Sequence, residues 1–132
     1  MNFFGFDLFA GAGGLSEGFL QAGYKIIGTV EKDYWACETQ KTRYMFYYLK
    51  KINKIKEYWD YCKIGNDWNA ISKQKIESVK DTIYRKYHDL KEEIKNTIWE
   101  SEFNEKKNKE NINLLKKSCK FHQVNKIHFI LG

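Results

Sequence analysis

The amino-acid sequence predicts an α/β fold built on parallel strands, and three observations lead to this prediction. Two apolar runs that are typical of buried strands, residues 3–9 and 26–30, are separated by a helix-compatible stretch over 15–22. Three glycines lie within four positions shortly after the first run. A further apolar run over 127–131 is typical of another buried strand. Strands that alternate with helices favour a parallel sheet with crossover helices.

The first third of the chain predicts four elements in order. They are strand 2–9, helix 14–22, strand 25–30 and helix 33–50. Gly23 stands where a left-handed glycine commonly ends a helix, and Asp33 is a suitable N-cap for the helix that follows it. We expect strands 2–9, 25–30 and 127–131 to be parallel, with 2–9 in the middle, because right-handed crossovers leave few other arrangements.

After about residue 45 the composition changes to lysine, asparagine, isoleucine, tyrosine and glutamate. Apolar side chains at intervals of three and four predict one amphipathic helix, and they are Ile76, Val79, Ile83, Tyr87, Leu90, Ile94 and Ile98. Residues 65–67 predict a turn before it. Residues 104–111 carry almost no apolar side chain, which predicts a mobile loop.

The glycine-rich segment after the first strand predicts a binding site. Glycines at a strand-to-helix turn allow positive φ angles and let the backbone pass close to a nucleotide-like ligand. The second strand ends at Glu31, eighteen residues after Gly13. A carboxylate at that end of a neighbouring strand can accept hydrogen bonds from two ribose hydroxyls. The turn, the helix and the acid together therefore predict a site for a ribose-containing ligand.

Several stretches of the sequence resemble the DNA cytosine-5 methyltransferase family. The segments that carry the resemblance are 6–19, Ala22-Gly23-Tyr24, 30–33 with Ala36, Cys37 and Thr39, and 127–132. The resemblance is close over residues 3 to about 45, and it resumes at the strand that leads into the family's catalytic loop. It implies an incomplete Rossmann-like, S-adenosylmethionine-dependent methyltransferase sheet with a helical insertion.

The resemblance also implies roles for individual residues in binding S-adenosylmethionine. Backbone amides of Gly11, Ala12, Gly13 and Gly14 would face the amino-acid end of the cofactor, where a helix N-terminus suits a carboxylate. Phe9 would lie against the cofactor, and Glu31 would hold the ribose. Lys32 stands where the family commonly has a large apolar residue over the adenine, which is a departure. The family's acid for the adenine amino group has no counterpart that the sequence identifies.

The resemblance implies that this sequence is an N-terminal part of such an enzyme. We expect a cofactor-binding part over 1–45, a lysine-rich helical insertion over 46–126 and a strand over 127–132 before the catalytic loop. That loop carries a Pro-Cys nucleophile, and the sequence has no proline. We therefore expect no catalytic residue in these 132 residues and no activity from them alone. Duplex DNA would be the partner of the complete enzyme, and a complementary polypeptide with the loop could restore it.

Cysteine and histidine residues do not predict a metal site or a nucleophile. Cys119, His122 and His128 contain one ligand-like spacing without a second. Cys37 has no base near it in sequence, and we expect a buried core thiol. The odd number of cysteines and the absence of a signal-peptide pattern predict a cytoplasmic chain with free thiols, and no apolar run is long enough to span a membrane.

Two alternatives of other classes stay open, one suggested by charge and the other by the glycine turn. Residues 1–40 carry two lysines and five acids, a net charge of −3; since the whole chain carries +6, residues 41–132 carry +9. That excess would suit a small basic DNA-binding module. The glycine turn and Glu31 would also suit a nicotinamide or flavin dinucleotide-binding domain, although the Gly-x-Gly-Gly arrangement lacks the usual Gly-x-Gly-x-x-Gly spacing.

Overall fold

A computed structural model describes residues 2–65 and 73–132. Its elements are β1 (Phe4–Asp7), α1 (Gly14–Gln21), β2 (Lys25–Glu31), α2 (Tyr34–Lys51), α3 (Ile55–Gly65), α4 (Lys73–Lys86), α5 (His88–Lys95), β3 (Ile98–Glu100), α6 (Asn108–Phe121) and β4 (Phe129–Leu131). The fold is α/β, as predicted. The predicted turn over 65–67 extends beyond the described residues.

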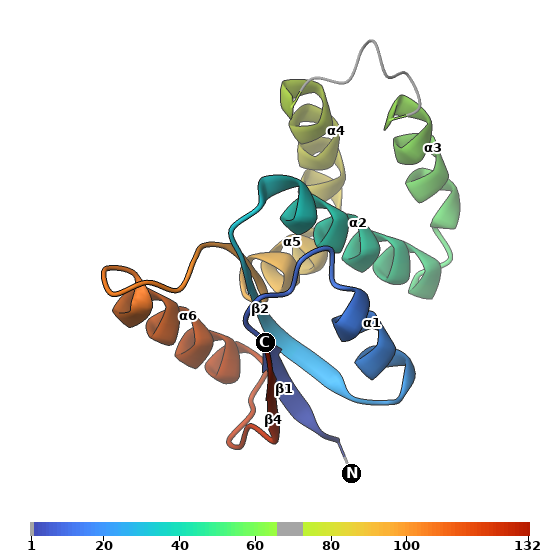
Figure 1. The fold of residues 1–132 in the computed structure, drawn as a ribbon. Helices are drawn as coiled ribbons and strands as arrows, with labels where there is room; N and C mark the ends of the chain where they lie inside the picture. Colours follow the sequence, from blue (N-terminus) through green and yellow to red (C-terminus); the bar gives the residue numbers. More distant parts are fainter. Residues whose placement is uncertain (1, 66–72) are drawn as a thin grey trace. The chain divides into compact units, whose positions relative to one another are not determined.

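The four strands form one parallel sheet in the order β3-β2-β1-β4. The prediction that strand 2–9 lies between 25–30 and 127–131 is confirmed, because β1 pairs with β2 on one side and with β4 on the other. Figure 1 shows α1 and α6 on opposite sides of this sheet, and both helices contact β2. The sheet is therefore covered in the manner of a Rossmann-like domain.

A buried cluster joins α6 to the sheet. Phe6 of β1, Ile27 of β2 and Val124 are almost fully buried, and Leu115 and Cys119 of α6 pack against them. The hydroxyl of Ser118, also on α6, donates a hydrogen bond to the carbonyl of Ile27, so that the helix meets an interior strand through both apolar and polar contacts. These contacts fix the strand from which Glu31 extends.

Both predicted helix caps of the first third are confirmed. Gly23 has φ of 87° and donates to the carbonyl of Leu20, while Tyr24 donates to that of Phe19. This pair of bonds is a Schellman motif, and the rings of Phe19 and Tyr24 pack across it with centroids 5.3 Å apart. At the start of α2, the side chain of Asp33 accepts the amide of Ala36 at 2.7 Å.

The prediction of one continuous helix over the apolar repeat from Ile76 to Ile98 is wrong in its extent. It is divided into α4 and α5 at Tyr87, and Ile98 belongs to strand β3. Ile98 and Trp99 pair with β2, where both are buried, so burial in the sheet prevails over the helical spacing that Ile98 continues. The loop predicted over 104–111 is also too long, because α6 begins at Asn108.

By their contacts, the residues form two compact units, one of Met1–Lys41 with Ile94–Gly132 and the other of Thr42–Glu93. The first contains the whole sheet. Strand β3 and helix α6 lie inside the range 46–126 for which a helical insertion was expected, and they belong to this first unit. The division of the sequence at residues 45 and 126 stays a prediction.

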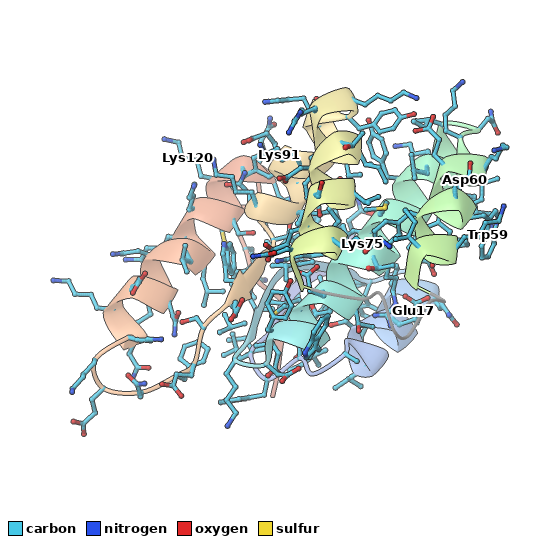
Figure 2. The ribbon with its side chains drawn as sticks, turned by 90° about the horizontal axis from the view of Figure 1, so that it is seen from above. Glu17, Trp59, Asp60, Lys75, Lys91 and Lys120 are labelled. Carbon is cyan, nitrogen blue, oxygen red and sulfur yellow. The ribbon has the colours of Figure 1, made fainter. Side chains whose placement is uncertain are left out.

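The second unit, Thr42–Glu93, is helical in its described residues. Glu57 of α3 accepts hydrogen bonds from Lys86 of α4 at 2.6 Å and from Tyr87 at 2.8 Å. The rings of Phe46 and Tyr58 pack at 5.1 Å, while Trp59 is 52% exposed and projects from α3 (Figure 2). In the described part of the chain, no helix is long and apolar enough to cross a membrane.

Candidate cofactor site

The turn between β1 and α1 is formed by glycine residues with positive φ angles. Gly11 has φ of 53° and Gly13 has φ of 79°. The amide of Gly13 donates to the carbonyl of Ala10 at 2.8 Å, which closes the turn, and α1 begins at Gly14. Left-handed conformations of this kind cost little only for glycine, so the local backbone requires the residues that the sequence supplies.

Space is open beside this turn. A Cβ atom added to Gly11 or to Gly14 would meet no heavy atom within 4 Å. The first amides of α1 have no carbonyl partner within their own helix, and the N-terminus of a helix favours negative charge. The turn therefore has room, and the start of α1 has donors, for an anionic or polar group of a ligand, while the amides of Gly11 and Gly13 already donate to Glu31 and Ala10. Larger residues at Gly11 or Gly14 would fill that room.

Glu31 faces the turn from the end of β2. Its Oε2 accepts the amide of Gly11 at 2.8 Å, and its Oε1 accepts the amide of Asp33 at 2.8 Å. The structure thus brings together two predicted site residues that are twenty positions apart in the sequence. The carboxylate is oriented by two backbone donors, both of which are fixed by the fold.

A second carboxylate lies at the end of β1. Asp7 is only 2% exposed, and its Oδ2 accepts the hydroxyl of Ser16 at 2.6 Å. Ser16 belongs to the first turns of α1, so this bond connects the strand before the glycine turn to the helix after it. Both ends of the turn are consequently anchored.

The remaining predicted site residues lie at the surface. Phe9 is 67% exposed, and its ring packs at 5.9 Å from that of Phe103, which follows β3. Ala12 is exposed on the turn, and Lys32 is exposed directly after Glu31. Phe9 and Lys32 therefore flank the ends of β1 and β2 without being part of the core.

Comparison with known proteins shows the family to which the chain belongs. A family model described as C-5 cytosine-specific DNA methylase matches residues 3–72, which includes the glycine turn, Glu31 and Lys32. The chain belongs to this methylase family. No solved structure matches the chain significantly.

Two curated relatives are methylases of bacterial origin. The chain is 32% identical over 133 residues to the Type II methyltransferase M.Bpa9945I of Bacillus paralicheniformis (strain ATCC 9945a / NCIMB 11709 / CD-2), which covers 96% of this chain and 29% of that protein. It is 61% identical over 33 residues to the Type II methyltransferase M.DdeI of Desulfomicrobium norvegicum (strain DSM 1741 / NCIMB 8310), covering 25% of this chain and 8% of that protein. The chain therefore spans less than a third of the length of either relative.

The structure of this methylase chain also shows two acids near the site, Glu100 and Glu102, that the sequence did not predict there. Glu100 is the last residue of β3 and pairs in register with Glu31, so both acids lie at the carboxyl edge of the sheet. Glu102 follows, immediately before Phe103, the residue that packs on Phe9. The apolar pair Ile98-Trp99 before these acids is the signal that could have identified a strand here, but it coincides with the end of a helical repeat.

Cys37 of the methylase chain is a core thiol, as the sequence suggested. It is fully buried, and its Sγ lies 3.4 Å from the carbonyl oxygen of Glu31. Burial is the main cause that raises its pKa to about 11, and the acids Glu100, Glu31 and Glu38 add to this while Lys41 opposes it. The thiol therefore stays protonated at neutral pH, when it is a poor nucleophile.

The other residues considered for metal binding or catalysis pack elsewhere. The Nε2 of His122 lies 3.1 Å from the hydroxyl of Thr97, and burial is the main cause that lowers the pKa of His122 to about 4. His128 accepts the amide of Phe4 through Nδ1. Within residues 2–65 and 73–132, no three acidic, histidine or cysteine side chains gather in a way that could hold a metal ion.

Proposed function

We propose that this methylase chain binds S-adenosylmethionine at the glycine turn. The observation that carries the proposal is the hydrogen bond between Glu31 and the amide of Gly11, because it brings the ribose-type acid and the glycine backbone to one place at the carboxyl edge of a parallel sheet. The open space beside Gly11 and Gly14 fits a ligand there.

Each part of the site then has a task. The turn and the first amides of α1 receive the amino-acid end of the cofactor, Glu31 accepts hydrogen bonds from the ribose hydroxyls, and Phe9 packs against the ligand. The aliphatic stem of Lys32 covers one side of the adenine in place of an apolar residue. When bound, S-adenosylmethionine supplies the methyl group that the complete enzyme transfers to C5 of cytosine in DNA.

We assign the adenine amino group to Glu102. In the methylase family the acid that binds the adenine amino group follows the third strand of the chain. In this chain the third strand is β3, and Glu100 and Glu102 are the two acids at its end. The contact between Phe103 and Phe9 favours Glu102, since it holds the segment beside a residue assigned to the ligand. Replacing Glu102 with glutamine should weaken binding of the cofactor more than replacing Glu100 with glutamine.

The methyl transfer itself belongs to a longer enzyme in this proposal. The family's chemistry needs a cysteine thiolate in a Pro-Cys loop and a cytosine that is turned out of the duplex. Proline is absent from the 132 residues. The relatives named as Type II methyltransferases support a restriction-modification role, with duplex DNA as the substrate. A complementary polypeptide with the loop could pair with β4, which is at the edge of the sheet.

A thermal-shift panel with S-adenosylmethionine, NAD and duplex DNA tests the proposed cofactor. We expect S-adenosylmethionine to raise the unfolding temperature and NAD to leave it unchanged, since ligands stabilise the state that they bind. Stabilisation by NAD alone would favour a dinucleotide-binding domain. Stabilisation by DNA alone would favour a basic DNA-binding module, and either result would contradict the proposal.

A further inference from the structure

The peptide units of Gly11 are held by side chains on both sides. Glu31 accepts the amide of Gly11 at 2.8 Å, and the Nε2 of Gln40 donates to the carbonyl of Gly11 at 2.7 Å. Gly11 is also one of the residues with positive φ in the turn. Two side chains from β2 and α2 therefore fix the orientation of the peptides on either side of one left-handed glycine.

The direction of the amide of Gln40 follows from its partners. The carbonyl of Gly11 can only accept a hydrogen bond, so the nitrogen of the amide must face it. The oxygen of the amide then faces the hydroxyl of Thr29 at 2.8 Å, and that hydroxyl must donate its single proton to Gln40. A reversed amide would place two acceptors against each other at Gly11, so this arrangement has one satisfied form.

Both side chains of this connection are buried. Gln40 is 3% exposed and Thr29 is 2% exposed. Thr29 is also held by the sheet, because its amide donates to the carbonyl of Thr97 at 2.6 Å beside β3. The position of Gln40 is thus set by an interior strand, and the loss of either hydrogen bond would leave a polar group unpaired inside the protein.

We propose that Gln40 is a positioning residue that fixes the glycine turn in the conformation that receives S-adenosylmethionine. It acts through Gly11 and makes no contact with the ligand, and the inference rests on the proposed function of the site. A turn that is held before binding loses less conformational freedom when the ligand binds, so the protein binds the ligand more tightly. The role adds a residue from α2 to a site whose other parts come from the start of α1 and from the ends of β1, β2 and β3.

Replacement of Gln40 with glutamate is the sharpest test, because it retains the shape and the acceptor for Thr29. An ionised carboxylate offers no donor to the carbonyl of Gly11, whereas a protonated one does. A buried carboxyl beside a carbonyl oxygen favours its protonated form, so the donor returns as the pH falls. We expect S-adenosylmethionine to bind Gln40→Glu about tenfold more weakly than the wild type at pH 8, and the ratio to approach one at pH 5.

Calorimetric titration of the 132-residue chain at both pH values measures this ratio, with Gln74→Glu as the matched control on the exposed surface of α4. Protonation of a buried carboxylate also reverses a defect in folding, so circular dichroism at both pH values must show that Gln40→Glu is folded. Weaker binding by the folded variant at pH 8, with recovery at pH 5, then identifies the hydrogen bond. Thr29→Val is the second variant; it removes the partner of Gln40 and should also weaken binding, in case Gln40→Glu does not fold.

Amide hydrogen exchange without ligand separates this inference from the proposed function. We expect the amides of Gly11 and Ala12 to exchange faster in Gln40→Glu at pH 8 than in the wild type, even if the chain binds no S-adenosylmethionine. Failure of the wild type to bind the cofactor would overturn the proposed function, and with it the role of Gln40 in binding. Equal affinity and equal exchange in the wild type, in Gln40→Glu at pH 8 and in Thr29→Val, which involves no titrating group, would overturn the positioning role alone.

Discussion

At the scale of single residues, the carboxylate of Glu31 is both a structural and a candidate binding group. Its two oxygens each accept one backbone amide, from Gly11 and from Asp33. Because each carboxylate oxygen can accept two hydrogen bonds, capacity remains for two ribose hydroxyls. The amides orient the group and leave it available, so Glu31 needs no rearrangement to take the role proposed for it.

His122 gives a prediction for stability as a function of pH. Its pKa in the folded chain is lowered to about 4, chiefly by burial and further by Lys25. The unfolded chain therefore binds a proton more readily than the folded chain between pH 6.5 and about 4. Neutral His122 therefore makes its full contribution to the free energy of unfolding above this pH window, and that contribution is lost as the pH falls through the window.

We expect the free energy of unfolding in urea to fall between pH 7 and pH 5, and His122→Gln to reduce this fall. Glutamine retains a polar partner for Thr97 but does not titrate. His88→Gln, at an exposed position on α5, is the matched control and should leave the pH dependence as in the wild type. The same fall with pH in the wild type and His122→Gln would contradict this assignment.

The sequence predicts some of these residues and not others for a physical reason. Glu31 stands at the end of an apolar run, eighteen residues after Gly13. This spacing is typical of a strand, glycine turn, helix and second strand, so the sequence alone indicates that Glu31 lies near the turn. Gln40 is one polar residue within a helix, and no pattern distinguishes it from a solvated one. Its burial arises only when α2 packs over the turn and the hydroxyl of Thr29, on β2, meets its side chain.

At the scale of elements, periodic patterns predict long elements better than short ones. The runs that became β1 and β2 and the helices that follow them were predicted to within a few residues, because each carries its own strand or cap signal. Strand β3 has three residues, and its Ile98 continues a helical spacing. Only pairing with β2 makes this segment a strand, which is a tertiary effect that local sequence does not contain.

Gly28 in β2 tests how closely the sheet is packed. A Cβ atom there would lie 2.8 Å from a ring carbon of Phe6 and 3.0 Å from one of Trp99, and both rings are buried. We expect Gly28→Ala to lower the free energy of unfolding by about 1–3 kcal/mol, the usual cost of overpacking a core. Urea denaturation followed by circular dichroism measures the change.

Gly18→Ala is the matched control, because a Cβ atom at that position of α1 would meet nothing within 4 Å. Alanine in a helix interior is favoured over glycine, so this variant should be more stable than the wild type by about 0.5–1 kcal/mol. If Gly28→Ala were as stable as the wild type, the packing of Phe6 and Trp99 around β2 would be wrong.

At the scale of the whole molecule, the sheet brings every candidate ligand group to one edge. The parallel order β3-β2-β1-β4 places the carboxyl ends of all four strands together, and Asp7, Glu31 and Glu100 are the last residues of β1, β2 and β3. The sequence predicted three of these strands and their order. The place of β3 and α6 in the sheet-bearing unit could not be predicted, since it depends on contacts between segments about seventy residues apart, such as Thr29 and Thr97.

The 132 residues should transfer no methyl group to DNA. They contain no proline and hence no Pro-Cys loop, and Cys37 is buried with its pKa raised to about 11. Incubation with tritiated S-adenosylmethionine and mixed-sequence duplex DNA should give background counts. Methylation of cytosine by this chain alone would mean that Cys37, Cys62 or Cys119 acts as the nucleophile, and it would contradict this expectation.

Calorimetric titration of S-adenosylmethionine into the wild-type chain and Glu31→Ala tests the central claim most directly. We expect the wild type to bind and Glu31→Ala to bind more weakly by about 1–3 kcal/mol, roughly 5- to 150-fold, as for the loss of hydrogen bonds to a charged group. Glu105→Ala, which removes an exposed carboxylate after β3, should bind as the wild type does. Equal affinity of the wild type and Glu31→Ala, or no binding by the wild type, would contradict the account.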